Sequence, residues 1–163
     1  MFHIVLYQPE IPPNTGNIMR LAANTGARLH LIHPLGFDLS EKQLRRAGLD
    51  YREQATVTEH PDFEAFLATI KPQTLHALSS KTSDNFFEAR FQAGDAFLFG
   101  PETRGLPAHI LQHPAVTSRL RLPMKAGNRS LNLGNAVSVC LYEAWRQTGF
   151  VEAATSYKPQ ATS

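Results

Sequence analysis

The chain contains only one cysteine, Cys140, so it can form no internal disulfide. A single thiol fits a reducing compartment, and its place in an apolar helical pattern predicts a buried packing residue. No apolar run approaches the length of a membrane span, and the run at residues 4–6 is too short for the core of a signal peptide. We therefore expect a cytoplasmic protein that does not bind a membrane.

The chain also has little excess of charge of either sign, since the formal net charge of the 163 residues is only +2 at pH 7. The overall charge therefore does not predict a nucleic-acid partner, and local clusters have to be considered. Two basic clusters occur, one with Arg45, Arg46 and Arg52, and the other with Arg119, Arg121, Lys125 and Arg129. Each cluster is equally compatible with a nucleic-acid contact and with an ordinary solvated surface.

The common cofactor motifs are missing as well. No Gly-x-Gly-x-x-Gly follows the first apolar run, so the chain lacks the fingerprint of a Rossmann dinucleotide site. Residues 100–105 have the glycine spacing of a phosphate loop, but Leu106 and Pro107 stand where that motif needs lysine and a hydroxyl. His109 and His113 have helical spacing without the glutamate and third ligand of a zinc site, so we expect no metal.

The composition is that of a folded domain. Hydrophobic residues make up 42% of the chain and charged residues 18%, which is too apolar for a disordered protein. The length suits a single domain, which we expect to span residues 1–156. Residues 157–163 are polar and without periodicity, and they are predicted to form a disordered tail.

Short apolar runs alternate with segments of helical periodicity. The predicted strands are residues 2–7, 29–32, 75–78, 96–99 and 116–122. The predicted helices are residues 15–25 after an Asn14 cap, a basic helix between Ser40 and Gly48, a helix that opens at residues 61–62, and a long helix from near Asn132 to Gly149. This alternation predicts an α/β fold with a mainly parallel sheet and helices on both faces.

Two junctions between a strand and the next loop are candidate ligand sites. Gly100 follows a buried strand, at the sheet edge where open α/β folds bind ligands, although a plain tight turn explains a glycine equally well. The second junction follows Leu122 and is dense in small polar residues between Gly127 and Ala136. Within it, Ser130 or Asn132 could simply cap the helix that follows.

Three segments resemble, in order and spacing, the motifs of the SPOUT methyltransferases. They are residues 12–20 (PPNTGNIMR), 99–106 (FGPETRGL) and 130–137 (SLNLGNAV). Residues 45–51 (RRAGLDY) and 142–146 (YEAWR) further resemble the minimal branch of that class, the TrmL-type 2′-O-methyltransferases of the tRNA wobble nucleotide. The resemblance covers nearly the whole chain, from Phe2 to about Gly149.

The resemblance implies a SPOUT fold whose C-terminal part forms a deep trefoil knot, which is rare among proteins. It implies a homodimer, with apolar residues such as Ile18 and Trp145 in the interface. The implied reaction transfers a methyl group from S-adenosyl-L-methionine to the ribose 2′-hydroxyl of cytidine 34 or uridine 34, with a tRNA anticodon stem-loop as partner. One alternative is a SPOUT enzyme that methylates ribosomal RNA or a base nitrogen. The other is a non-catalytic RNA-binding protein, and the three intact motifs disfavour this second alternative.

By the same resemblance, the backbone of the knot loops holds the adenosylmethionine. The cofactor-binding residues implied are Leu78, Gly100, Glu102, Leu122, Met124, Ser130 and Leu131. Glu102 has two equally good structural roles, namely capping a helix that begins near Leu106 and pairing with a neighbouring arginine.

Arg20, in the first motif, is the leading catalytic candidate. Because an arginine stays protonated well above neutral pH, we expect it to polarise the 2′-hydroxyl and hold a nearby phosphate rather than act as a base. Asn132 could orient the ribose or the methionine end. Tyr142 could stack on a nucleobase, reach the target with its hydroxyl, or simply pack in the core. The predicted RNA contacts are Arg45, Arg46 and Arg52.

Overall fold

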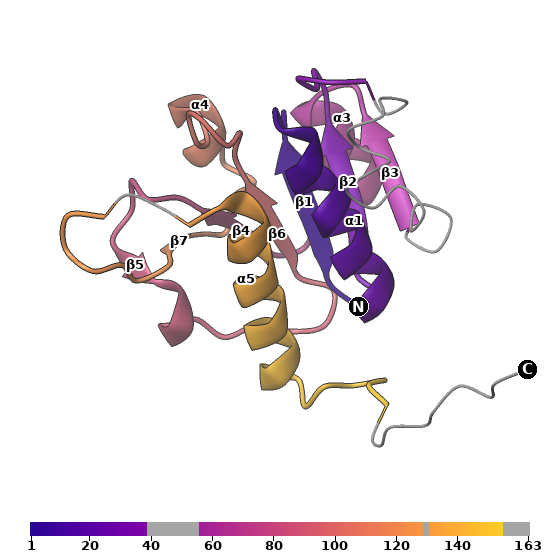
Figure 1. The fold of residues 1–163 in the computed structure, drawn as a ribbon, viewed down its shortest axis with the longest axis vertical. Helices are drawn as coiled ribbons and strands as arrows, with labels where there is room; N and C mark the ends of the chain where they lie inside the picture. Colours follow the sequence, from indigo (N-terminus) through magenta and orange to yellow (C-terminus); the bar gives the residue numbers. More distant parts are fainter. Residues whose placement is uncertain (39–55, 129–130, 155–163) are drawn as a thin grey trace, which may run out of the picture.

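A parallel β-sheet forms the centre of the computed structural model, which describes residues 1–38, 56–128 and 131–154 (Figure 1). Within these residues its seven strands are β1 (His3–Tyr7), β2 (Arg28–Ile32), β3 (Thr56–His60), β4 (Leu75–Leu78), β5 (Asp84–Asn85), β6 (Ala96–Phe99) and β7 (Ser118–Arg121). Their order is β3-β2-β1-β6-β4-β7-β5, and every neighbouring pair is parallel. The predicted parallel sheet is confirmed.

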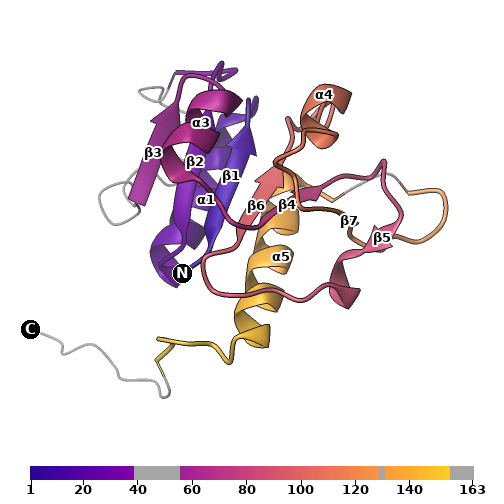
Figure 2. The same cartoon turned by 180° about the vertical axis from the view of Figure 1, so that it is seen from behind.

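Helices cover both faces of this sheet, as predicted. They are α1 (Pro12–Thr25), α3 (Phe63–Ile70), the 3-10 turn η2 (Phe86–Glu88), α4 (Ala108–Leu111) and α5 (Leu133–Gln147). Helices α1 and α5 lie over one face, and the view from behind shows α3 over the other (Figures 1 and 2). The apolar residues of α4 pack on the same side as those of α3.

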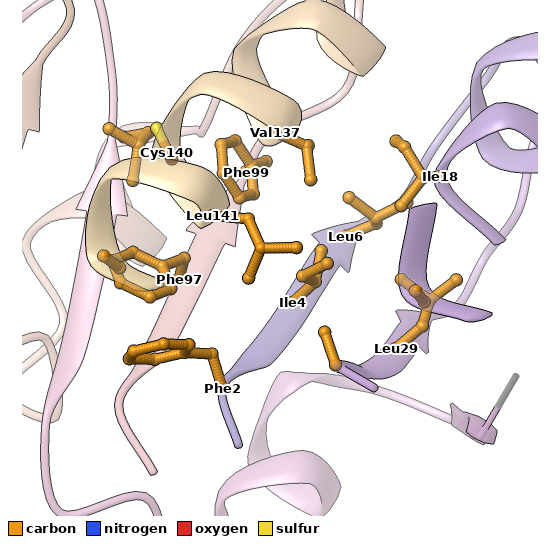
Figure 3. Packing of buried hydrophobic residues seen from close by; sticks show 14 of the residues in the cluster. Phe2, Ile4, Leu6, Ile18, Leu29, Phe97, Phe99, Val137, Cys140 and Leu141 are labelled. Atoms are coloured by element: carbon orange, nitrogen blue, oxygen red, sulfur yellow. The ribbon is translucent and has the colours of Figure 1, made fainter. Parts of the chain in front are cut away.

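The hydrophobic core consists of two layers, one on each side of the sheet. Because successive side chains of a strand point to opposite faces, β1 sends Ile4 and Leu6 toward α1 and α5, while Val5 and Tyr7 face α3 and α4. Figure 3 shows the first layer, where residues of α5 such as Leu141 meet the β1 side chains. A strand buried on both faces is mostly apolar, which explains the apolar runs in the sequence, and buried polar side chains such as His30 of β2 are hydrogen-bonded.

Helices α1 and α5 contact each other and are anchored in the first layer. Cys140 is fully buried there, and this burial raises the pKa of its thiol, so the predicted packing role is confirmed. Ile18 and Trp145 are buried in the same layer, and the Trp145 indole N–H donates a hydrogen bond of 2.9 Å to the carbonyl of Val151. The expectation that these two side chains belong to a dimer interface is therefore wrong.

Several predicted boundaries differ from the structure. Helix α1 begins at Pro12 rather than at residue 15, because prolines are tolerated in the first turn of a helix, and its N-cap is Ile11 rather than Asn14. Strand β7 is shorter than the predicted run at residues 116–122. Strand β3 was not predicted, since at the sheet edge only His60 of its five residues is buried. The predicted basic helix and the tail at residues 157–163 lie outside the described residues.

The remaining helix predictions hold. Asp62 caps α3, accepting a 2.7 Å hydrogen bond from the Ala65 backbone N–H, and Asn132 caps α5. In the described part of the chain, no helix is both long enough and apolar enough to cross a membrane.

Three histidines form a hydrogen-bonded row across strands β1, β2 and β3. His3 Nδ1 lies 2.8 Å from His30 Nε2, and His30 Nδ1 lies 3.0 Å from His60 Nε2. The rings of His30 and His60 both contact the edge or face of Phe66 from α3. Burial, followed by the charges of His3, His60 and Arg28, lowers the pKa of His30 to about 3. The folded protein therefore holds His30 as a neutral imidazole.

Acid should destabilise the protein through this row. Below the ordinary histidine pKa of 6.5 the unfolded chain binds a proton at His30 that the folded chain excludes, so stability falls as the pH falls from 6.5 toward 3. His30 alone should cost about 2 kcal/mol between pH 6.5 and about pH 5. Urea unfolding at several pH values measures this slope.

The matched variants for that experiment are His30→Gln and His109→Gln. Glutamine at position 30 can still form hydrogen bonds but does not titrate, so the acid-dependent slope should become shallower, with a remainder from His3 and His60. His109 is exposed on α4, and its substitution should leave the slope unchanged. An unchanged slope in His30→Gln would contradict the assignment.

Candidate functional site

A pocket of about 300 Å³ opens at the carboxyl edge of the sheet. Its walls follow the ends of β4, β6 and β7, and the first turn of α5 completes it. Because parallel strands all end at the same edge, this is where an α/β fold is expected to bind a ligand. The lining residues are Leu78, Ser79, Ser80, Lys81, Phe99, Gly100, Pro101, Glu102, Thr103, Arg104, Gly105, Arg121, Leu122, Met124, Leu131, Leu133 and Ala136.

Gly100 is required by the turn that follows β6. A Cβ at this position would lie 2.9 Å from the Gly105 Cα and closer still to the Leu106 backbone nitrogen, so no side chain fits. The turn closes through a 2.8 Å hydrogen bond from the Gly105 N–H to the Pro101 carbonyl. Of the two explanations considered from sequence, the tight turn therefore accounts for this glycine without a ligand, although Gly100 also lines the pocket.

The Glu102 carboxylate binds the beginning of α1. It accepts hydrogen bonds of 2.8 Å from the Glu10 backbone N–H, 2.7 Å from the Ile11 backbone N–H and 3.3 Å from the Asn14 side-chain amide. Ile11 has no side chain that can cap the helix, so Glu102 supplies the negative charge that a helix start favours. The helix that Glu102 serves is therefore α1, not the one near Leu106.

Asn132 continues this polar chain. Its Oδ1 accepts a 3.3 Å hydrogen bond from the Asn135 N–H at the start of α5, and its Nδ2 donates a 3.1 Å bond to Asn14 Oδ1. Asn14 is buried and links Asn132 to Glu102. From the sequence, Asn14 was expected only to cap a helix, and its link to Asn132 and Glu102 was not predicted. The sequence feature that could have indicated the link is the presence of Asn14 in the first motif and Asn132 in the third.

The residues predicted to bind the cofactor gather at this pocket. Leu78, Gly100, Glu102, Leu122, Met124 and Leu131 all line it, whereas Ser130 lies outside the described residues. The predicted RNA contacts Arg45, Arg46 and Arg52 also lie outside the described residues.

None of the three catalytic candidates lines the pocket of its own chain, although Asn132 stands between Leu131 and Leu133, which do. Arg20 is exposed on α1, and Tyr142 is exposed on α5 with its ring edge-on to Trp145 at 5.6 Å between centroids. The alternative that Tyr142 is a core residue is therefore wrong, since 44% of its surface is exposed. Both helices pack on the same face of the sheet.

Two cationic side chains in the pocket wall had no predicted role in the cofactor site. Lys81 follows β4, and Arg121 ends β7. Neither has an acidic partner among residues 1–38, 56–128 and 131–154, whereas Arg104 in the same wall donates a 3.1 Å hydrogen bond to Gln8 Oε1. These cations give the pocket a positive rim. Across the described ranges, no group of three or more His, Cys, Asp or Glu side chains could hold a metal ion.

Comparison with known proteins identifies a family and close relatives. The sequence profile of the SpoU rRNA Methylase family matches residues 1–142. A protein of Methylovorus glucosotrophus named tRNA (cytidine(34)-2'-O)-methyltransferase is 58% identical over 94% of this chain and 99% of its own length. A protein of Escherichia coli K12 with the same name is 57% identical over 92% of this chain and 96% of its own length.

A solved structure extends the comparison to the fold. It concerns the 2-OH methylation of C/U34 on tRNA and superimposes with a TM-score of 0.86. The two sequences are 48% identical, and the match covers 92% of this chain and 97% of the other.

Gly100→Ala should lower the free energy of unfolding by about 3 kcal/mol, the upper end of the usual cost of overpacking, because the added carbon meets backbone that cannot rotate away. Gly105→Ala in the same turn is the matched control. Gly105 has a φ of +66° and open space around its Cβ position, so alanine should cost about 1 kcal/mol of backbone strain only. Urea unfolding compares the two. A cost for Gly100→Ala no larger than that for Gly105→Ala would contradict the steric argument.

Proposed function

The chain belongs to the SpoU rRNA Methylase family, and we propose that it is a tRNA 2′-O-methyltransferase that acts on the ribose of cytidine 34 or uridine 34. The observation that carries the proposal is the pair of relatives whose names give this activity on cytidine 34, and which are 58% and 57% identical to this chain over nearly its whole length. The solved structure on the methylation of C/U34 supports the inclusion of uridine. We further propose a cytoplasmic location and a single catalytic domain over residues 1–156.

The proposed methyl donor is S-adenosyl-L-methionine, which supplies a methyl group on a positively charged sulfur. The pocket suits it, because a volume of about 300 Å³ is in the range of small-ligand sites and apolar side chains such as Leu78 and Leu122 line the wall. Gly100 leaves the main chain accessible beside them. Met124, Leu131 and Glu102 complete the proposed site, together with Ser130. No metal is needed for this transfer.

Methyl transfer of this kind is an in-line displacement, so the main task of the protein is to align the 2′-oxygen and ease the loss of its proton. We assign Arg20 to donate hydrogen bonds to that oxygen as negative charge develops, and to hold an adjacent phosphate that helps to accept the proton. An amide nitrogen carries two N–H groups, so Asn132 can bind Asn14 and a ribose at once. Tyr142 is assigned to stack on a nucleobase.

The proposed tRNA contact is electrostatic. Lys81 and Arg121 line the proposed donor pocket, and the ribose that accepts the methyl group has to lie next to the donor, with a phosphate on each side of it in RNA. Arg45, Arg46 and Arg52 are proposed to bind the anticodon stem-loop farther out.

We also propose that the protein acts as a homodimer. Arg20 and Tyr142 do not line the pocket of their own chain, and in the proposed dimer the second copy supplies them to it. Helix α5 presents exposed apolar residues for such a contact, namely Val139 and Tyr142, and Phe150 and Val151 follow it. The C-terminal part is proposed to form a trefoil knot, in keeping with the way that α5 joins the loops after β4, β6 and β7 in one pocket.

Arg20→Ala should lower the rate of methyl transfer about 100-fold in a single turnover at saturating tRNA and donor, since a preorganised donor to a developing oxyanion contributes about that much. Arg20→Lys is the matched control, because it keeps the positive charge but loses the forked geometry of the guanidinium. Its rate of methyl transfer should lie between those of the wild type and Arg20→Ala. The product must resist alkaline cleavage at nucleotide 34, because a methylated 2′-oxygen cannot attack the next phosphate. Label transferred to an anticodon that stays alkali-labile there would refute ribose methylation.

Mixing two inactive variants tests the shared site. One subunit carries Arg20→Ala, and the other carries Leu122→Trp, which fills its pocket. If Arg20 serves the pocket of the partner subunit, a heterodimer of the two has one site with both substitutions and one site with neither. Activity should therefore return to about a quarter to a half of the wild-type value after subunit exchange. If no activity returns although sedimentation confirms the heterodimer, Arg20 serves its own chain.

A further inference from the structure

Two loops meet at the carboxyl edge of the sheet next to the pocket. One joins β1 to α1, and the other joins β6 to α4. Strands β1 and β6 are neighbours, with Leu6 paired to Phe99, so the loops that follow them start side by side. The first loop leads into the helix that carries Arg20, and the second forms a wall of the pocket.

Each loop holds the other through a glutamate. Glu102 of the second loop accepts from the backbone N–H groups of Glu10 and Ile11, as described above. In the opposite direction, the Glu10 carboxylate accepts a 3.0 Å bond from the Thr103 backbone N–H and a 2.8 Å bond from the Thr103 hydroxyl. The contact is therefore reciprocal, and it joins residues more than 90 positions apart in the chain.

The environment of Glu10 favours its ionised form. The hydrogen bonds from the Thr103 backbone and then its hydroxyl lower the pKa of the Glu10 carboxyl, and Arg104 lowers it further, with its Nε 3.9 Å from Glu10 Oε2. A charged acceptor binds N–H and O–H donors more strongly than a neutral one. Although 28% of the Glu10 side chain is exposed, Thr103 and Arg104 both contact its carboxylate.

Glu102 alone cannot fix the pocket wall. Its bonds secure its own position, but the next residue, Thr103, also lines the pocket, and the turn ends at Gly105, which has a left-handed backbone. Among the described residues, Glu10 is the side chain that accepts from the Thr103 backbone. Removing Glu10 would therefore release Thr103, while the hydrogen bond from the Gly105 N–H to the Pro101 carbonyl still closes the turn.

We propose that Glu10 is a positioning residue that couples the cofactor pocket to α1, so that filling the pocket fixes the helix carrying Arg20. This inference rests on the proposed function. Glu10 touches neither reactant. It acts through Thr103 on one side and, because Glu102 binds its backbone, through the start of α1 on the other.

Three variants test the proposal, namely Glu10→Ala, Glu10→Gln and the control Glu64→Ala. Glu64 is an exposed glutamate on α3 that pairs with His113 at 2.8 Å, so its loss removes a comparable surface ion pair away from the pocket. The measurements are calorimetric titration with S-adenosylmethionine, the single-turnover rate at saturating donor and tRNA, and hydrogen exchange of the Thr103 amide.

Glu10→Ala should bind the donor at least tenfold more weakly, transfer the methyl group about tenfold more slowly even at saturation, and exchange the Thr103 amide faster. A role limited to donor affinity would leave the saturated rate unchanged. Glu10→Gln should recover most of both losses, because its amide oxygen can still accept from Thr103. Glu64→Ala should match the wild type in all three measurements.

Two results would overturn the proposal. One is wild-type affinity and rate in Glu10→Ala, and the other is equal losses in the alanine and glutamine variants, which would point to the charge rather than the hydrogen bonds. Failure of the proposed function is distinguishable, because the wild-type protein itself would then not bind the donor or methylate tRNA. The Thr103 exchange still reports in that case whether Glu10 holds the loop.

Discussion

Parallel pairing of every described strand is the constraint on which the structure depends. It buries the sheet on both faces, so the central strands are mostly apolar and two layers of helices cover them. It also brings the carboxyl ends of β1, β4, β6 and β7 to one edge. The loops at that edge come from distant parts of the chain, yet they form one pocket and one polar network.

The sequence predicted those features that depend on local patterns. Continuous apolar runs located β4 and β6 to the residue, and capping residues located the starts of α3 and α5. Strand β3 was not predicted because an edge strand needs few buried residues, and its sequence, TVTEH, shows little apolar character. The start of α1 was placed too late because Asn14 was expected to cap the helix, whereas a first helical turn accepts both Pro12 and Pro13.

The sequence predicted which residues line the pocket but not the hydrogen bonds that join them. A resemblance over three motifs selected six described residues that line the pocket. It could not show that Glu102 binds the beginning of α1, because a hydrogen bond across 88 to 92 residues leaves no local pattern. Nor could it show that Gly100 is required by a backbone contact. Motif residues in this fold therefore hold the loops in place as well as lining the pocket.

The position of α5 has a consequence for synthesis on the ribosome. This helix follows all seven described strands in the chain, and it supplies both the last part of the first core layer and, through Leu133 and Ala136, part of the pocket wall. A nascent chain that has emerged only as far as β7 therefore exposes Phe97 and Phe99 to water and has an incomplete pocket. Folding cannot be completed before α5 leaves the exit tunnel, so the newly made protein completes its first core layer and its pocket at the same moment.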